Sequence, residues 1–315
     1  MNKPRALKKG CTIGLVGPAS PGADPESLDK AAGFIEGLGF NVKPGRAARD
    51  RYGYLAGRDA DRAGDIHEMF ADRAVDGIFC LRGGYGTPRL ARMLDMAVIR
   101  RNPKVFLGYS DITTLLIQFS QMADLITFHG PMPVSDMIRD DFSACSLESL
   151  MSALTGTAPR VLRNPAADAV CLYPGVATAP ITGGNLTLIG LTMGTPYEID
   201  TRGKLLLIED IDEEPYRTDG RLCQLRNAGK FEDCAGFIIG SFNGSFKGSP
   251  ESLPPADKTL TMEQIIEDLI LPAGKPVLSN FSAGHCEPNL TIPFGIPATL
   301  DAAAGTLSFG EGFVE

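Results

Sequence analysis

The stretch GIFCLRGGYG at residues 77–86, followed by VFLGYSDI at residues 105–112, decides the fold. In each stretch a short apolar run, at residues 77–81 and 105–108, passes directly into a glycine-rich loop or into the start of a helical pattern. Apolar runs of four or five residues are typical of strands that are buried on both faces. Such strands, separated by helical segments, predict βαβ units and a mostly parallel sheet.

The same alternation extends outward from these two stretches. Residues 12–16 form a further apolar strand, and residues 25–38 carry apolar side chains at helical spacing. A helix is expected at residues 111–122 and a strand at residues 125–128. These elements predict an α/β domain over residues 1–158, and ligands of such domains bind beyond the carboxyl ends of the strands.

The composition changes after this region. Residues 159–178 are rich in Pro, Gly, Ala and Thr, which is typical of a linker between domains. Residues 179–315 then alternate short apolar runs with helical patches less regularly than the first half. We expect this part to form a smaller, mixed α/β domain.

Composition and charge exclude several classes of protein. The formal net charge is −8, whereas sequence-independent nucleic-acid binding depends on clustered Lys and Arg. No apolar run approaches the roughly 20 residues of a membrane-spanning helix. The seven cysteines form no CxxC pair, which favours reduced thiols and a cytoplasmic location. The sequence also lacks HExxH and Cys/His clusters, so neither a metal nor a cofactor is predicted.

Ser110 lies where a strand meets a helix, which is the context of a nucleophile elbow. The start of the following helix offers backbone N–H groups, that of Asp111 first, to a developing oxyanion. The pattern departs from GxSxG because Ile112 occupies the position of the second glycine. A helix cap formed by Ser110 or Asp111 is therefore the alternative interpretation.

The loop Arg82-Gly-Gly-Tyr-Gly86 contains three glycines in five residues. Glycines permit a close approach between the backbone and a ligand. The loop could cradle a phosphate, supply a second N–H to an oxyanion, or simply form a tight turn. It is neither GxGxxG nor a P-loop, because the spacing differs and the lysine is absent.

A serine nucleophile requires a base and an acid that orients it. The chain has three histidines, and His129 and His285 both follow predicted strands, whereas His67 lies in a charged amphipathic helix. Glu209 and Asp210 follow a further strand, and because successive residues of a strand face opposite sides, only one can face a given cleft. Local sequence leaves both choices open.

Six segments together resemble the LD-carboxypeptidase family, which also contains the microcin C self-immunity peptidases. They occur in family order and cover most of the chain. The segments are RGGYGTPRL (82–90), GYSDIT (108–113), FHGPM (128–132), GGNLTLI (183–189), LIEDIDEEPYR (207–217) and GHCEPNLTIPFG (284–295).

The resemblance implies a Ser–Glu–His triad, which falls on Ser110, Glu209 and His285. It assigns the second oxyanion donor to the glycine loop, which we place on the N–H of Gly84, with Gly83 as the alternative. It further implies a flavodoxin-like N-terminal domain, with a parallel sheet and helices on both faces, a smaller C-terminal domain, and a homodimer.

The implied activity is that of a serine carboxypeptidase that removes the terminal D-alanine from murein tetrapeptides during cell-wall recycling. Arg82 or Arg217 is expected to bind the substrate carboxylate. Residues 241–255 match no family segment, so contacts there stay open. One alternative is a microcin-immunity-type peptidase that acts on peptidyl- or aminoacyl-nucleotides. The other is a non-catalytic module that binds a phosphate or a sugar.

Overall fold

The computed structural model describes residues 1–242 and 258–315. Most of the unmatched segment 241–255 therefore lies outside the described residues. The chain divides into two compact units, which are described separately. Unit 1 comprises Met1–Pro159, Glu287–Ile296 and Glu311–Glu315, and unit 2 comprises Arg160–Cys286 and Pro297–Gly310.

Unit 1 is built on a six-stranded sheet with the order β12-β5-β4-β3-β1-β2. Its first five strands along the chain are parallel, and β12 pairs antiparallel with β5. The order 2-1-3-4-5 is that of flavodoxin-like sheets. The strands are β1 (Thr12–Val16), β2 (Asn41–Pro44), β3 (Gly77–Cys80), β4 (Val105–Gly108), β5 (Thr127–His129) and β12 (Ile292–Phe294).

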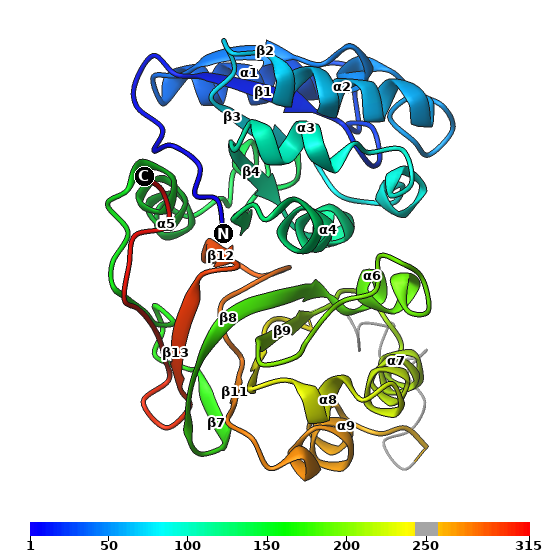
Figure 1. Ribbon diagram of the computed structural model, residues 1–315, viewed down its shortest axis with the longest axis vertical. Coiled ribbons are helices and arrows are strands. Elements are labelled where there is room, and N and C mark those ends of the chain that lie inside the picture. Colours follow the sequence, from blue (N-terminus) through cyan, green and yellow to red (C-terminus); the bar gives the residue numbers. More distant parts are fainter. Residues whose placement is uncertain (243–257) are drawn as a thin grey trace. The chain divides into compact units, whose positions relative to one another are not determined.

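Helices cover both faces of this sheet (Figure 1). The chain moves from β1 to β2 in one direction and from β2 through β3 to β4 in the other. Because such crossovers are right-handed, α1 lies on one face and α2, α3 and α4 lie on the opposite face. The helices are α1 (Ser27–Gly37), α2 (Asp59–Ala71), α3 (Met96–Arg101), α4 (Thr113–Ala123) and α5 (Ala144–Thr155), with short turns η1 (Arg46–Arg49), η2 (Thr87–Leu90), η3 (Ser110–Ile112) and η4 (Pro133–Met137).

The described residues of unit 2 form an eight-stranded sheet with the order β6-β14-β13-β8-β9-β10-β11-β7. The central four strands, β8 to β11, are parallel, and the outer strands pair antiparallel. The strands are β6 (Val161–Leu162), β7 (Val170–Tyr173), β8 (Val176–Asn185), β9 (Leu205–Glu209), β10 (Gly236–Ile239), β11 (Val277–Ser279), β13 (Pro297–Asp301) and β14 (Thr306–Phe309).

The described helices of unit 2 follow the parallel strands in the chain, as in βαβ units. They are α6 (Leu186–Thr192), α7 (Pro215–Asn227), α8 (Lys230–Asp233), α9 (Met262–Leu269) and the turn η5 (Leu271–Ala273). The mixed α/β class predicted from the sequence is confirmed.

The division into units differs from the ranges that composition suggests. Residues 159–178, expected as a linker, carry β6 and β7 of the second sheet. The prolines and glycines of this segment lie largely at strand ends, where they interrupt pairing without preventing it. Residues 287–296 return to unit 1, because Ile292 of β12 pairs with His129 of β5. Local composition carries no information on this long-range pairing.

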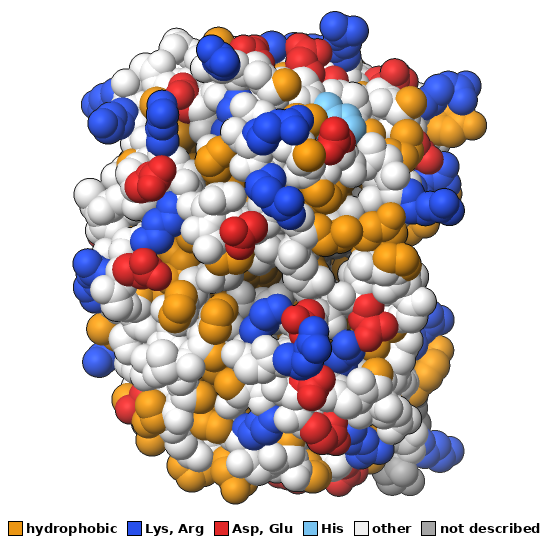
Figure 2. All heavy atoms as spheres, in the orientation of Figure 1, with side chains coloured by type: hydrophobic (Ala, Val, Ile, Leu, Met, Phe, Trp, Pro, Cys, Tyr) orange, Lys and Arg blue, Asp and Glu red, His pale blue; other side chains and the backbone are white. Residues whose placement is uncertain are grey.

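Charged side chains of both signs are mixed on the surface. Figure 2 shows Lys and Arg interspersed with Asp and Glu over the face that it displays. Several form local ion pairs, such as Arg89 with Asp59 and Lys43 with Glu68. Within the described ranges, no helix combines the length and the apolar character needed to cross a bilayer.

Candidate active site

Ser110 occupies a sharp turn between β4 and α4 of unit 1 (Figure 1). Its φ is 61°, in the left-handed region that non-glycine residues rarely adopt, and Tyr109 before it is extended. Such backbone strain concentrates at functional sites. The turn is tight because Ile112 covers Gly108, where a Cβ atom would lie 2.8 Å from the Ile112 side chain. The strand–turn–helix context of a nucleophile elbow is therefore present.

The glycine loop lies directly against this serine. A Cβ atom on Gly83 would be 2.8 Å from both Cβ and Oγ of Ser110 and 3.3 Å from the backbone N of Asp111. Gly84 has a φ of +107°, and a Cβ atom there would lie 2.3 Å from Oγ of Ser20. Within the described part of the chain, the N–H groups of Gly84 and Asp111 donate to no protein acceptor. Both groups therefore remain available to a ligand.

A buried polar network ties the glycine loop to the serine turn. The backbone N of Thr87 donates to Oδ2 of Asp111 over 2.8 Å, and Thr87 Oγ1 donates to the Asp111 carbonyl. The guanidinium of Arg62 donates to the carbonyl of Gly86 over 3.1 Å and to that of Pro18. Asp111 is fully buried, and Arg62 is 1% exposed. These hydrogen bonds therefore hold the glycine loop and the Ser110 turn together.

Burial controls the charge state of Asp111. Loss of solvent raises the pKa of this carboxyl from 3.8 to about 6, against the opposing effect of the hydrogen bonds from Thr87. Asp111 is therefore ionised at neutral pH, with the backbone N–H of Thr87 as its hydrogen-bond donor.

In unit 2, Glu209 and His285 form a pair. Glu209 ends β9 and is fully buried, and its Oε2 lies 2.6 Å from Nδ1 of His285, whose side chain is 13% exposed. Gly284 has a φ of +94°, and a Cβ atom there would lie 2.4 Å from Oε2 of Glu209. Ser241 Oγ donates to the carbonyl of His285 over 3.1 Å. A carboxylate on Nδ1 fixes the tautomer in which Nε2 accepts a proton.

Asp210 faces away from this pair. Its carboxylate accepts hydrogen bonds from Asn185 Nδ2 at 2.9 Å and from the backbone N and Oγ1 of Thr187 at 3.0 and 2.7 Å. Asp210 therefore binds the first turn of α6. Burial is the main cause that raises its pKa, and the charge of Glu209 raises it further. The two adjacent acids therefore have different partners, as expected for successive residues at the end of a strand.

The other two histidines have different surroundings. His129 is fully buried, and its ring stacks on Phe294 with a centroid distance of 5.7 Å and contacts Tyr109 edge-on at 5.8 Å. His67 Nε2 accepts a hydrogen bond from the backbone N of Asp95 over 2.8 Å. His285, in contrast, is paired with the carboxylate of Glu209.

The two arginines expected to contact substrate lie in different units. Arg82 donates to the carbonyl of Pro21 over 3.2 Å. Arg217 is 55% exposed, stacks on Tyr216 and lies 3.8 Å from the carboxylate of Glu214. Their substrate contacts stay predictions. The described residues contain no group of three His, Cys, Asp or Glu side chains that could hold a metal ion.

Sequence reasoning missed Arg62, Thr87 and Ser20. Ser20 Oγ accepts from the backbone N of Tyr85 over 3.2 Å and so supports the glycine loop. Arg62 lies in a helix with many charges, and nothing in the local sequence distinguishes a buried arginine from a solvated one. Besides Asp59 in the same helix, its partners are the carbonyls of Pro18 and Gly86 in two distant loops, which only the folded chain brings together.

Comparison with known proteins identifies the family. Residues 13–130 match the LD-carboxypeptidase N-terminal domain, and residues 178–300 match the LD-carboxypeptidase C-terminal domain. The chain is 44% identical over 316 residues to a probable murein peptide carboxypeptidase of Bacillus subtilis, covering 99% of this chain and 96% of that protein.

Solved structures extend the comparison. A muramoyltetrapeptide carboxypeptidase from Oxalobacter formigenes has a TM-score of 0.81 and 27% identity, with 94% of this chain and 97% of that chain covered. A variant of the microcin C7 self immunity protein in complex with adenosine monophosphate has a TM-score of 0.88 at 21% identity over the whole of both chains, which shows the fold alone. The chain therefore belongs to the LD-carboxypeptidase family.

Proposed function

We propose that this protein is a serine carboxypeptidase that hydrolyses the L,D-peptide bond to the terminal D-alanine of murein tetrapeptides, in cell-wall recycling. The observation that carries the proposal is the strained turn of Ser110, with the glycine loop packed against its hydroxyl. The buried Glu209–His285 pair provides the acid and the base that such a nucleophile requires. The relative in Bacillus subtilis supports the substrate class.

In the proposed reaction, Oγ of Ser110 attacks the carbonyl that precedes the C-terminal D-amino acid. Nε2 of His285 takes the hydroxyl proton as the O–C bond forms, and the carbonyl oxygen becomes an oxyanion. The C–N bond then breaks, and His285 gives the proton to the leaving amine. Water attacks the acyl-serine with the same base and releases the shortened peptide. Glu209 stabilises the imidazolium in each step.

The oxyanion is proposed to bind the N–H groups of Gly84 and Asp111. Both belong to segments that touch Ser110, and neither N–H is used within the described residues. Preorganised donors of this kind contribute about 3–4 kcal/mol to the stabilisation of a transition state. Because Gly83 approaches Ser110 more closely than Gly84, its N–H is the alternative donor.

Cytoplasmic location and a homodimer complete the proposal. All seven cysteines are free thiols, which fits a reducing compartment. The homodimer follows from the family resemblance, and light scattering coupled to gel filtration would test it. A mass of one chain in solution would contradict it.

Mass spectrometry of a murein tetrapeptide after incubation with the protein tests the function. The wild type is expected to remove one alanine. Ser110→Ala should reduce kcat by about 10⁴–10⁶-fold. Ser120→Ala, on helix α4 beyond the turn, is the matched control and should retain turnover. Near-wild-type turnover by Ser110→Ala would refute the assignment of the nucleophile.

Two other functions predict different outcomes. A microcin-immunity-type peptidase would cleave an aminoacyl-sulfamoyl adenosine faster than the tetrapeptide when both are assayed side by side. A non-catalytic module would bind a phosphate or sugar in calorimetry and hydrolyse neither compound. The 44% identity to a probable murein peptide carboxypeptidase, against 21% to the microcin C7 self immunity protein, favours the tetrapeptide.

A further inference from the structure

The glycine loop is hydrogen-bonded to the loop between β1 and α1, residues 17–26, which we call the β1–α1 loop. The backbone N of Ser20 donates to the carbonyl of Gly83 over 3.2 Å, and Oγ of Ser20 accepts from the backbone N of Tyr85 over 3.2 Å. A Cβ atom on Gly84 would lie 2.3 Å from Oγ of Ser20. Ser20 therefore contacts Gly84 and binds the peptide groups on both sides of it.

These two hydrogen bonds set the direction of the Gly84 N–H group. The peptide bond between Gly83 and Gly84 is trans and planar, so its C=O and N–H groups point in opposite directions. The carbonyl of Gly83 is directed to Ser20, and the N–H of Gly84 in the same peptide therefore points away from Ser20. The next peptide is reversed, because its N–H, that of Tyr85, is directed to Ser20. Gly84, with a φ of +107°, is the residue at which the backbone makes this reversal.

The glycine loop needs such external contacts because its own backbone is not stiff. Three of the five residues from Arg82 to Gly86 are glycines, and glycine adopts several backbone conformations at little cost. An oxyanion donor stabilises a transition state only if its direction is fixed before the reaction begins. Ser20 therefore supplies, from outside the glycine loop, the rigidity that the glycines lack.

Two arginine side chains strengthen the connection between the two loops. Nη1 of Arg82 donates to the carbonyl of Pro21 over 3.2 Å. Nη1 of the buried Arg62 donates to the carbonyls of Pro18 and Gly86. The β1–α1 loop is thus joined to the glycine loop on both sides of Ser20 in the sequence, which fixes the place from which Ser20 acts.

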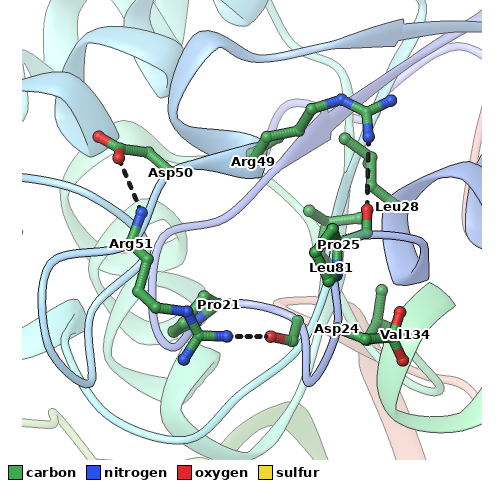
Figure 3. Close-up of a pocket in the computed structure, with 11 residues that line it drawn as sticks. Pro21, Asp24, Pro25, Leu28, Arg49, Asp50, Arg51, Leu81 and Val134 are labelled. Carbon is green, nitrogen blue, oxygen red and sulfur yellow. Dashed lines mark hydrogen bonds between the residues drawn. The ribbon is translucent and has the colours of Figure 1, made fainter.

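The β1–α1 loop is also held on a second side. A cavity of about 330 Å³ is lined by this loop and by residues 48–51 after β2 (Figure 3). Nη2 of Arg51 donates to the carbonyl of Gly22 over 2.8 Å, and Nη1 of Arg49 donates to that of Pro25 over 3.5 Å. Because this side of the loop is hollow, hydrogen bonds hold it there in place of close packing.

We propose that Ser20 is a positioning residue for the oxyanion site, because it fixes the direction of the Gly84 N–H; this inference rests on the proposed function. Ser20 acts through the backbone of the glycine loop and takes no part in bond making. The same contacts favour Gly84 over Gly83 as the donor, since Ser20 binds both peptides that flank Gly84.

Ser20→Ala tests this role, because it removes the acceptor of the Tyr85 N–H and keeps the backbone N that binds the carbonyl of Gly83. We expect kcat for tetrapeptide hydrolysis to fall by about tenfold, less than the roughly 10²–10³-fold loss that follows the deletion of an oxyanion donor. KM should change by less than about twofold, because the donor acts on the transition state and not on the bound substrate.

The rate at which a fluorophosphonate labels Ser110 gives a second readout that does not depend on the peptide. Oγ of Ser110 attacks the phosphorus atom, fluoride leaves, and the phosphoryl oxygen gains negative charge on the way. This rate should therefore also fall by about tenfold in Ser20→Ala. Urea denaturation of each variant verifies that it is folded.

Ser27→Ala is the matched control. Ser27 directly follows the β1–α1 loop, and its hydroxyl donates to Oδ1 of Asp24 over 3.1 Å, within the same part of the chain. Its loss should reduce the free energy of unfolding and leave kcat and the labelling rate unchanged. The control thus separates a general weakening of the β1–α1 loop from the specific contact with the glycine loop.

A folded Ser20→Ala variant with the wild-type kcat and labelling rate would overturn the proposal. An equal loss of rate in Ser27→Ala, or a rise in KM in place of the fall in kcat, would overturn it as well. If the wild type hydrolysed no tetrapeptide, while labelling were slowed in Ser20→Ala and not in Ser27→Ala, the proposed function would fail and the role of Ser20 would stand.

Discussion

Gly83→Ala is the substitution whose effect on catalysis follows most directly from the structure. The added Cβ atom would lie 2.8 Å from Cβ and Oγ of Ser110, where ordinary van der Waals contacts begin at 3.4 Å. The φ of Gly83 is not positive, so alanine suits its backbone and the clash with the serine is the main effect. Relief of the clash requires a displacement of about 0.6 Å, the difference between these two distances.

This displacement would move Oγ of Ser110 and the backbone N of Asp111, one of the proposed oxyanion donors. Misplacement by about 1 Å reduces the rate of a positioned reaction by about 100-fold. We therefore expect kcat for tetrapeptide hydrolysis to fall by about 10–100-fold, with a smaller change in KM. Steady-state kinetics by mass spectrometry, with urea denaturation to verify folding, measures both effects.

Gly64→Ala is the control, because a Cβ atom on this helical glycine would meet nothing within 4 Å. Its kcat should match the wild type, and alanine should stabilise α2 by about 0.5–1 kcal/mol. If Gly83→Ala folded normally and retained the wild-type kcat, the contact between the glycine loop and the nucleophile would have no part in catalysis.

Three further predictions concern the carboxylates and Gly284. Glu209→Gln should lower kcat by about 10³–10⁴-fold, because an amide does not stabilise the imidazolium; an unchanged pH–rate profile would contradict the pairing. Because the pKa of Asp111 is raised from 3.8 to about 6 in the folded protein, protonation of this carboxyl stabilises the folded state. This contribution to the free energy of unfolding, about 3 kcal/mol, is fully present below about pH 4 and is lost as pH rises through about 6. Urea denaturation from pH 4 to 7 should therefore show the wild type losing about this much stability relative to Asp111→Asn, and a constant difference would refute it. Gly284→Ala should displace the Glu209 carboxylate, since the new Cβ would lie 2.4 Å from Oε2; it should lower kcat and the free energy of unfolding together, measured by kinetics and urea denaturation.

The sequence predicts β1, β3 and β4 well because these strands are short, apolar and separated by helical segments, whereas the polar, largely exposed edge strand β2 is not predicted. The strand expected at residues 105–108 coincides with β4, and the one expected at 77–81 ends one residue beyond β3. Each of these elements is specified by neighbouring residues. The pairing of β12 with β5 joins residues that are far apart in the chain, and no local pattern encodes it.

Local sequence could not choose the acid or the base. Glu209 and Asp210 are adjacent acids at the end of one strand, and only the structure shows that Asp210 binds the first turn of α6. His129 and His285 each follow a strand, and the choice came from the family resemblance. That resemblance is confirmed by the matches to both domains of the family, whereas the catalytic roles of Ser110, Glu209 and His285 stay predictions.

The central claim is that Ser110 is a nucleophile activated by His285. Incubation with a fluorophosphonate, followed by intact-protein and peptide mass spectrometry, tests it most directly. We expect one adduct per chain on the peptide that contains Ser110, formed much more slowly in His285→Ala. An adduct on another residue, or none on a folded protein that hydrolyses the tetrapeptide, would contradict it.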